Sequence, residues 1–150
     1  MSKRAVNLLR KMAVPVLHNA ANPLKGTRLD IITVSATSKT LTAAESGARV
    51  VWAGGSAATV TLPSVASGLY FEVFASTAQA HVLNGGDSVM SGVAYDNSND
   101  SDDANIDRLA INAGSSITLA NAAIGDSVRV WSDGTSWFVK GWFNDTPTVA

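Results

Sequence analysis

The sequence contains no cysteine and only two histidines among its 150 residues. The absence of cysteine excludes disulfides, thiolate catalysis and cysteine-based zinc sites. Charged residues make up 15% of the chain, whereas about a quarter is usual for a globular protein. Alanine, valine, threonine, serine and glycine take their place, and this composition favours strands and tight turns.

The sequence also shows no apolar run long enough for a secretory signal or a membrane span. Its first apolar run, Ala13 to Leu17, is interrupted by Pro15 and ends at His18, which is too short for either purpose. We therefore expect a soluble protein that is made and used without secretion and has no membrane partner. A length of 150 residues fits one domain and can bury a sizeable core without disulfides or metals.

Charge is distributed unevenly along the chain, although the formal net charge is only -1. Residues 1–28 carry six bases and no acid, whereas residues 29–150 carry five bases and twelve acids, giving +6 and -7. The hydrophobic spacing also predicts a short helix over residues 2–13, ended by Pro15. We predict an extended, partly helical N-terminal arm (1–28) in front of a β domain (29–150).

The arm is suited to docking onto a partner, because a helix this short is marginal alone in water. A solvated leader without a partner is the alternative. The residues that we expect to dock are Lys3, Arg4, Val6, Leu9, Arg10, Lys11 and Met12.

From Leu29 onward, short runs rich in valine, isoleucine, threonine and aromatics alternate with turn-forming clusters of glycine, asparagine, aspartate and serine. The predicted strands are 29–35, 39–43, 48–53, 57–62, 68–75, 79–83, 87–91, 107–111, 115–120, 126–132 and 135–141. Short strands with closely spaced turns predict an all-β fold, an antiparallel, jelly-roll-like sandwich or barrel. A parallel βαβ fold is not expected, because no later segment has a sustained helical period.

The C-terminal hairpin is the most detailed of these predictions. The pair Asp133–Gly134 indicates a two-residue type I′ turn. That register would place the core residues Val130 and Val128 opposite Trp137 and Val139, respectively. The other face would carry Arg129, Trp131, Ser136, Phe138 and Lys140. Because exposed aromatic patches usually mark interfaces, we expect the subunit interface of an oligomer at Trp131, Phe138 and Trp142.

An internal similarity links two parts of the β domain. Residues 60–75 align without gaps onto residues 117–132, and each copy is predicted to be a strand, a connection, and a glycine that opens a second strand. The identical pairs are Thr61/Thr118, Leu62/Leu119, Ala66/Ala123, Gly68/Gly125 and Val73/Val130. Duplication, or independent recurrence of one turn solution, would explain the similarity.

Catalysis is not expected. The sequence has no nucleophile elbow, P-loop, dinucleotide fingerprint or H-E-x-x-H motif. Glu45 and Glu72 are isolated and do not indicate a paired carboxylate site. We interpret His81 as a half-buried strand histidine with an ordinary hydrogen bond. A small hydrolase with a site around His81 is the third of our functional hypotheses.

The segment Asp96–Asp107 resembles an EF-hand in its spacing of oxygen side chains. However, Ser101 stands where the sharp turn needs glycine, Asp107 stands where a bidentate glutamate is required, and no helices flank the segment. We expect an exposed connection with incidental Ca²⁺ affinity, and no metal site or cofactor.

The four tryptophans, with Trp131 and Trp142 as candidates, would also suit a sugar-binding platform, but core packing or a subunit interface fits their apolar neighbours better. We expect no nucleic-acid binding, because no basic stripe interleaved with aromatics continues from the arm into the β domain.

Two stretches, Ala58 to Phe74 (ATVTLPSVASGLYFEVF) and Gly125 to Trp142 (GDSVRVWSDGTSWFVKGW), resemble head-decoration, or cement, proteins of tailed bacteriophages. The resemblance covers about half of the chain. It implies a trimeric β-sandwich or barrel seated on the major capsid protein, located at the capsid surface of a virion assembled in the host cytoplasm. It implies no catalytic or ligand residues. The leading hypothesis is thus a structural protein that decorates and stabilises a capsid, and the alternative is a receptor- or carbohydrate-binding module of a tail fibre.

Overall fold

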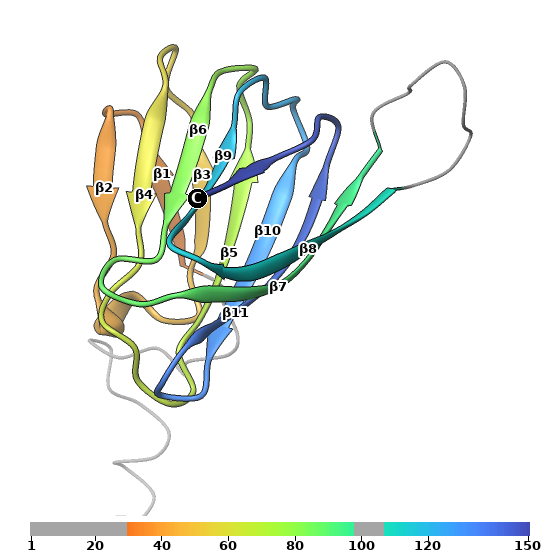
Figure 1. Ribbon diagram of the computed structural model, residues 1–150. Coiled ribbons are helices and arrows are strands. Elements are labelled where there is room, and N and C mark those ends of the chain that lie inside the picture. The colour runs from red at the N-terminus through yellow and green to blue at the C-terminus, as the bar shows by residue number, and fades with distance from the viewer. Residues whose placement is uncertain (1–29, 98–106) are drawn as a thin grey trace, which may run out of the picture.

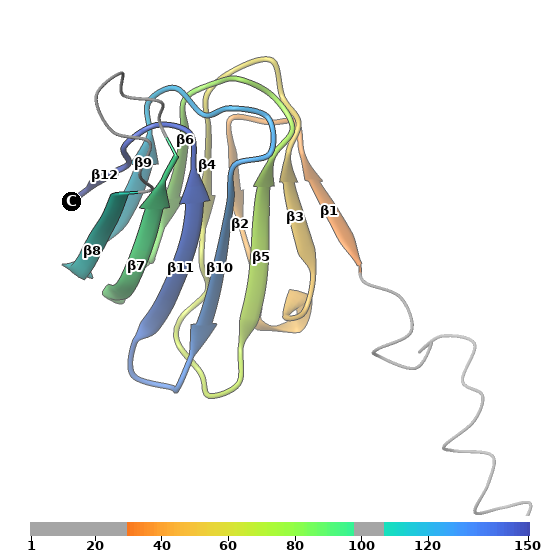
Figure 2. The same ribbon diagram turned by 90° about the vertical axis from the view of Figure 1, so that its right-hand side faces the viewer.

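In a computed structural model, which describes residues 30–97 and 107–150, the chain forms two mixed β-sheets packed in a sandwich-like fold (Figures 1 and 2). The seven-stranded sheet has the order β1 (Ile31–Val34), β3 (Arg49–Trp52), β5 (Tyr70–Ala75), β10 (Ser127–Ser132), β11 (Trp137–Phe143), β7 (Met90–Asp96), β8 (Asp107–Gly114). The five-stranded sheet has the order β12 (Thr148–Val149), β9 (Ser116–Leu119), β6 (His81–Asn84), β4 (Ala58–Thr61), β2 (Ser38–Thr40). The predicted all-β, sandwich-like architecture is confirmed.

One short 3-10 helix, η1 (Ala43–Glu45), connects β2 to β3. Glu45 closes a capping box with Thr42 and pairs with Lys39 at 2.7 Å. Over the two described ranges, no helix is long and apolar enough to cross a membrane. The predicted docking residues of the arm, from Lys3 to Met12, lie outside the described residues.

From β1 to β7 the chain passes to the opposite sheet with each successive strand. When the chain comes back to a sheet, the new strand therefore runs in the same direction as the previous strand of that sheet. This gives the parallel pairs β1–β3, β3–β5, β2–β4 and β4–β6. A parallel connection needs a crossover, usually a helix, and here a strand of the other sheet serves instead. The expected antiparallel pairing holds mainly in the second half of the chain, where β5–β10, β10–β11, β7–β8, β6–β9 and β9–β12 pair in that way.

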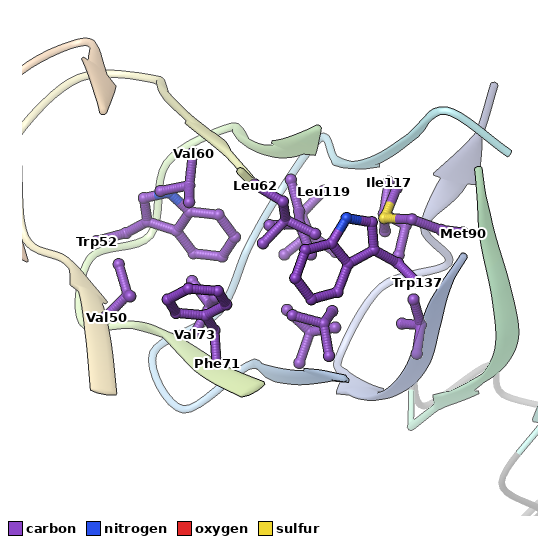
Figure 3. Close-up of a cluster of buried hydrophobic side chains, with 14 of the residues drawn as sticks. Val50, Trp52, Val60, Leu62, Phe71, Val73, Met90, Ile117, Leu119 and Trp137 are labelled. Atoms are coloured by element: carbon purple, nitrogen blue, oxygen red, sulfur yellow. The ribbon is translucent and has the colours of Figure 1, made fainter. Parts of the chain in front are cut away.

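The core lies between the sheets and is built from alternate residues of their strands, as the two-residue side-chain period requires. Its largest members are Trp52 and Trp137, which are 1% and 0% exposed. Figure 3 shows these two indoles within one continuous apolar layer. Smaller core residues around them include Val50, Val60, Leu62, Phe71, Val73, Ile117 and Leu119.

The β10–β11 hairpin corrects the predicted register. Val130 pairs with Val139 and Ser132 with Trp137, so the connection spans residues 133–136 instead of two residues. The Asp133 carboxylate lengthens the turn, because its Oδ1 accepts hydrogen bonds from the backbone amides of Thr135 (2.8 Å) and Ser136 (3.1 Å).

The predicted cross-strand partners are therefore wrong by two residues. A shift of two residues keeps every side chain on its face. The predicted core face, made of Val128, Val130, Trp137 and Val139, is accordingly buried.

The two similar sequence segments form the same structural unit. One comprises β4 and β5 and the other comprises β9 and β10, and each passes from the five-stranded to the seven-stranded sheet. The matched glycines, Gly68 and Gly125, both have positive φ, at 83° and 103°. The second strands of the two units pair antiparallel, with Glu72 opposite its aligned residue Arg129. The two segments are thus similar in structure as well as in sequence, and a local twofold axis relates β5 to β10 at the Glu72–Arg129 pair.

Candidate functional site

The outer surface of the seven-stranded sheet gathers aromatic and basic side chains in three rows that cross the strands. The first row contains Tyr70, Trp131 and Phe138. The middle row contains Arg49, Glu72, Arg129 and Lys140. The third row contains Phe74, Ser127, Trp142, Tyr95 and Arg108. We call these residues together the aromatic–basic face.

Glu72 organises the middle row. One carboxylate oxygen contacts Arg49 at 3.0 Å and the other accepts a hydrogen bond from Arg129 at 2.7 Å. Glu72 is only 7% exposed, whereas both arginines reach solvent. Burial raises the pKa of Glu72, but hydrogen bonds from Arg129 and Arg49 outweigh it and hold the pKa below its ordinary value. The ionised carboxylate therefore fixes two guanidinium groups on the surface.

The aromatic side chains of the face are held by contacts between neighbouring strands. Trp131 stacks on Phe138 with ring centroids 6.0 Å apart, and Tyr95 stacks on Trp142 at 4.4 Å. The Lys140 ammonium lies 5.5 Å from the centroid of Trp142, within the range of a cation–π contact. Trp131 and Trp142 nevertheless remain 43% and 47% exposed. The face thus presents preorganised rings with apolar area still open to a partner.

The charge of this face differs in sign from the remainder of the β domain. Four bases and one acid give it +3, while one base and eight acids in the rest of residues 30–97 and 107–150 give -7. Sequence reasoning missed this basic stripe, because its four basic residues lie on β3, β10, β11 and β8 and come together only through the strand order. The reason given against nucleic-acid binding, that no basic stripe interleaved with aromatics reaches the β domain, is therefore wrong. The absence of nucleic-acid binding remains a prediction.

All three predicted interface residues lie on the aromatic–basic face. Trp131 and Phe138 are neighbours in the first row, whereas Trp142 belongs to the third row and stacks on Tyr95. Basic residues of the middle row separate the two aromatic groups. Their role as a subunit interface remains a prediction, which the exposed rings of Trp131 and Trp142 support.

His81 lies in the core and not at a half-buried position as predicted. Its ring is 0% exposed and stacks on Trp52, with centroids 4.8 Å apart and planes 5° from parallel. The interpretation as half-buried is wrong because alternation along β6 indicates the face of a side chain but not its depth. A ring buried between the sheets cannot meet a substrate, so the structure gives the hydrolase hypothesis no support.

Burial lowers the pKa of His81, and backbone groups of Thr77 and Ala58 oppose this effect only in part. The unfolded chain, with a pKa near 6.5, therefore takes up a proton before the folded chain does. The resulting stability is fully present above pH 6.5 and is lost as the pH falls below it, by at most about 1.4 kcal/mol per pH unit.

We expect urea denaturation to give a lower free energy of unfolding at pH 5.5 than at pH 7.5. His81→Phe keeps an aromatic ring on Trp52 but cannot titrate, and it should flatten this dependence. An equally steep dependence in the variant would show that other groups cause it.

The acidic segment is only partly described. Asp96 is the last residue of β7, is 4% exposed and accepts a hydrogen bond from the Thr146 hydroxyl. The expected exposed connection is therefore wrong at Asp96, while residues 98–106 lie outside the described residues. Where the structure is described, no group of three or more histidine, aspartate or glutamate side chains is arranged to hold a metal ion.

No protein-family model matches the sequence, and comparison with curated proteins finds no match. The two segments from which we expect a resemblance to phage decoration proteins are Ala58–Phe74, which contains β4 and most of β5, and Gly125–Trp142, which contains β10 and most of β11. These segments supply much of the aromatic–basic face. Function is accordingly argued from that face.

Proposed function

We propose that this protein is a structural virion component that decorates and stabilises a bacteriophage capsid by binding the major capsid protein lattice. The aromatic–basic face is the observation that carries the binding role, as a surface that joins copies of the chain, and the +6 charge of residues 1–28 supports docking on the capsid protein. Tryptophan, tyrosine and arginine are the residues most enriched at protein–protein hot spots, and all three are concentrated there. Exposed aromatic clusters on soluble domains usually mark interaction surfaces.

The same geometry supports a binding role over a catalytic one. Both oxygens of Glu72 are engaged by arginines, so this carboxylate is a poor general base. His81 is enclosed by the core. The protein is thus proposed to be no enzyme and to use no cofactor.

In this proposal, arm and body have separate tasks. The basic arm docks on the major capsid protein, and the aromatic–basic face holds the bodies together as a homo-oligomer, most simply a trimer. The location is the capsid surface of a virion assembled in the host cytoplasm, without nucleic-acid or membrane partners.

Deleting residues 1–28 tests the task of the arm. We expect the truncated body to be folded and soluble, because the first described strand begins at Ile31. We expect it no longer to bind shells, because the docking residues have been removed. The measurement is cosedimentation with empty shells assembled from the major capsid protein of the same virus. A truncated chain that decorates shells as tightly as the intact chain would contradict this role.

Within the arm, Leu9→Asp should weaken shell binding more than Lys3→Ala. Apolar burial contributes about 25 cal/mol per Å², whereas a surface ion pair contributes about 0–1 kcal/mol and weakens with salt.

A receptor- or carbohydrate-binding module of a tail fibre is the second candidate. The observation in its favour is the exposed Trp142 ring beside Lys140 and Ser127, since sugar platforms combine an aromatic ring with polar side chains. Calorimetry with soluble polysaccharides separates the two candidates. Sugar binding that Trp142→Ala abolishes, without shell binding by the intact chain, would favour this candidate.

A further inference from the structure

We propose that the partner of the aromatic–basic face is a second copy of this chain, bound in a head-to-tail contact with the acidic end of its sandwich. The inference deepens the proposed function, since it rests on that function's oligomeric body and specifies how the bodies join. Head-to-tail contacts of one surface with a different surface close into rings when the rotation permits. A trimer is the smallest such ring.

A face-to-face dimer is disfavoured by charge. A twofold contact would place the aromatic–basic face against itself, and so would oppose two surfaces of +3. The one acid of the face is already bound to Arg49 and Arg129, so it cannot neutralise a partner's cations. Like charges facing each other in a desolvated interface are costly. The preferred partner surface is therefore acidic.

The same chain offers such a surface at one end of the sandwich. The register places the start of β1, the β10–β11 connection and the start of β7 at a common end, because Trp131 pairs with Tyr70 and Trp137 pairs with Met90. Figure 2 shows the start of β1 and the β10–β11 connection at this end.

Three exposed acids lie in these segments, namely Asp30, Asp87 and Asp133. Hydrogen bonds from Thr135 and Ser136 hold the pKa of Asp133 below its ordinary value, so this acid is ionised at neutral pH. Glu45 of η1 lies at the same end, before the start of β3, but is neutralised by Lys39. We call this region the acidic end.

The pairing of these two surfaces explains two features together. It covers Trp131 and Trp142, which otherwise expose apolar area to water, and it brings Arg108, Arg129 and Lys140 against carboxylates. Apolar burial would supply most of the affinity, while the charges set orientation and exclude the face-to-face arrangement.

Sedimentation velocity of the intact protein at micromolar concentrations is the first test. We expect a trimer at 50 mM salt whose apparent dissociation constant rises about tenfold at 500 mM, as screening weakens the contact between charges. A dimer, or a monomer at both salt concentrations, would overturn the inference.

Charge reversals on the two surfaces provide the second test. Lys140→Glu and Asp87→Lys should each weaken trimer formation about tenfold, because each places like charges in the contact. The control Asp145→Lys changes the net charge as much as Asp87→Lys but lies after the end of β11, at the opposite end of the sandwich, and it should change association less than about twofold. Circular dichroism verifies that each variant is folded.

A face-to-face contact predicts a different pattern, in which Asp87→Lys has no effect and Lys140→Glu strengthens association. That pattern would refute the head-to-tail contact, as would equal effects of Asp87→Lys and Asp145→Lys. A monomer that binds heparin through Lys140 would instead assign the face to an anionic polymer, and also overturn the inference.

Shell binding is measured separately, so the two proposals fail in distinguishable ways. A monomer that cosediments with shells contradicts the head-to-tail contact and leaves the capsid role intact. A salt-sensitive trimer that ignores shells supports the contact and contradicts the capsid role.

Discussion

Replacing Trp137 by alanine should lower the free energy of unfolding by about 3–5 kcal/mol, the range for truncating a large buried aromatic side chain. Trp137 is 0% exposed and lies between the sheets, with its ring centroid 6.1 Å from that of Phe71 (Figure 3). Alanine would remove these contacts and leave a cavity that rigid strands cannot close fully. Urea denaturation monitored by circular dichroism measures the loss.

Trp142 provides a matched control on the same strand. It is 47% exposed and faces outward, so Trp142→Ala should cost about 1 kcal/mol, mostly from its stacking on Tyr95. Its main effect should be on self-association. Equal losses of stability in the two variants would show that the inward and outward assignments of β11 are wrong.

Gly92→Ala should destabilise the protein by about 3 kcal/mol or more, at the upper end of the effect of overpacking. Gly92 pairs with Val139 where β7 meets β11, next to an irregular register with β8. A Cβ atom at this position would lie 1.9 Å from the carbonyl oxygen of Val139. Since this obstacle is backbone, β7 must separate from β11, and β8 joins the sheet only through β7.

Gly55→Ala is the control for Gly92→Ala. A Cβ atom there meets nothing within 4 Å, and Gly55 is not among the glycines with positive φ. Alanine should therefore be neutral or stabilise by about 0.4–1 kcal/mol, because it restricts the unfolded chain. Thermal unfolding of both variants tests the pair, and a similar midpoint for the two would contradict the close approach at Gly92.

The sequence predicted most strands because the two-residue alternation is visible in segments such as β4 and β10. It placed a strand at 87–91, whereas β7 runs from Met90 to Asp96. Gly92 interrupts the pattern there, although the glycine is needed for the close contact with β11. β12 was missed because two residues carry no periodic signal.

Strand order was beyond the reach of the sequence. Alternation shows which side chains share a face, but not which sheet a strand enters or which strand lies beside it. The outward direction of Trp131 and Phe138 was therefore predicted from the hairpin, whereas the meeting of Arg49, Glu72 and Arg129 from three strands was not. The depth of His81 depended in the same way on Trp52, which belongs to the opposite sheet.

The passage of successive strands between the two sheets also bears on cooperativity. A sheet with one apolar side is stable only when that side is covered, and here each strand from β1 to β6 is followed directly by one from the opposing sheet. Neither sheet is formed by one continuous piece of chain, so neither could assemble before the other. Both must gain their strands in step, and the loss of a continuous segment such as β3–β4 thins both layers at once. No contiguous half of the molecule comprises one complete sheet, so partial unfolding has no natural boundary between the layers.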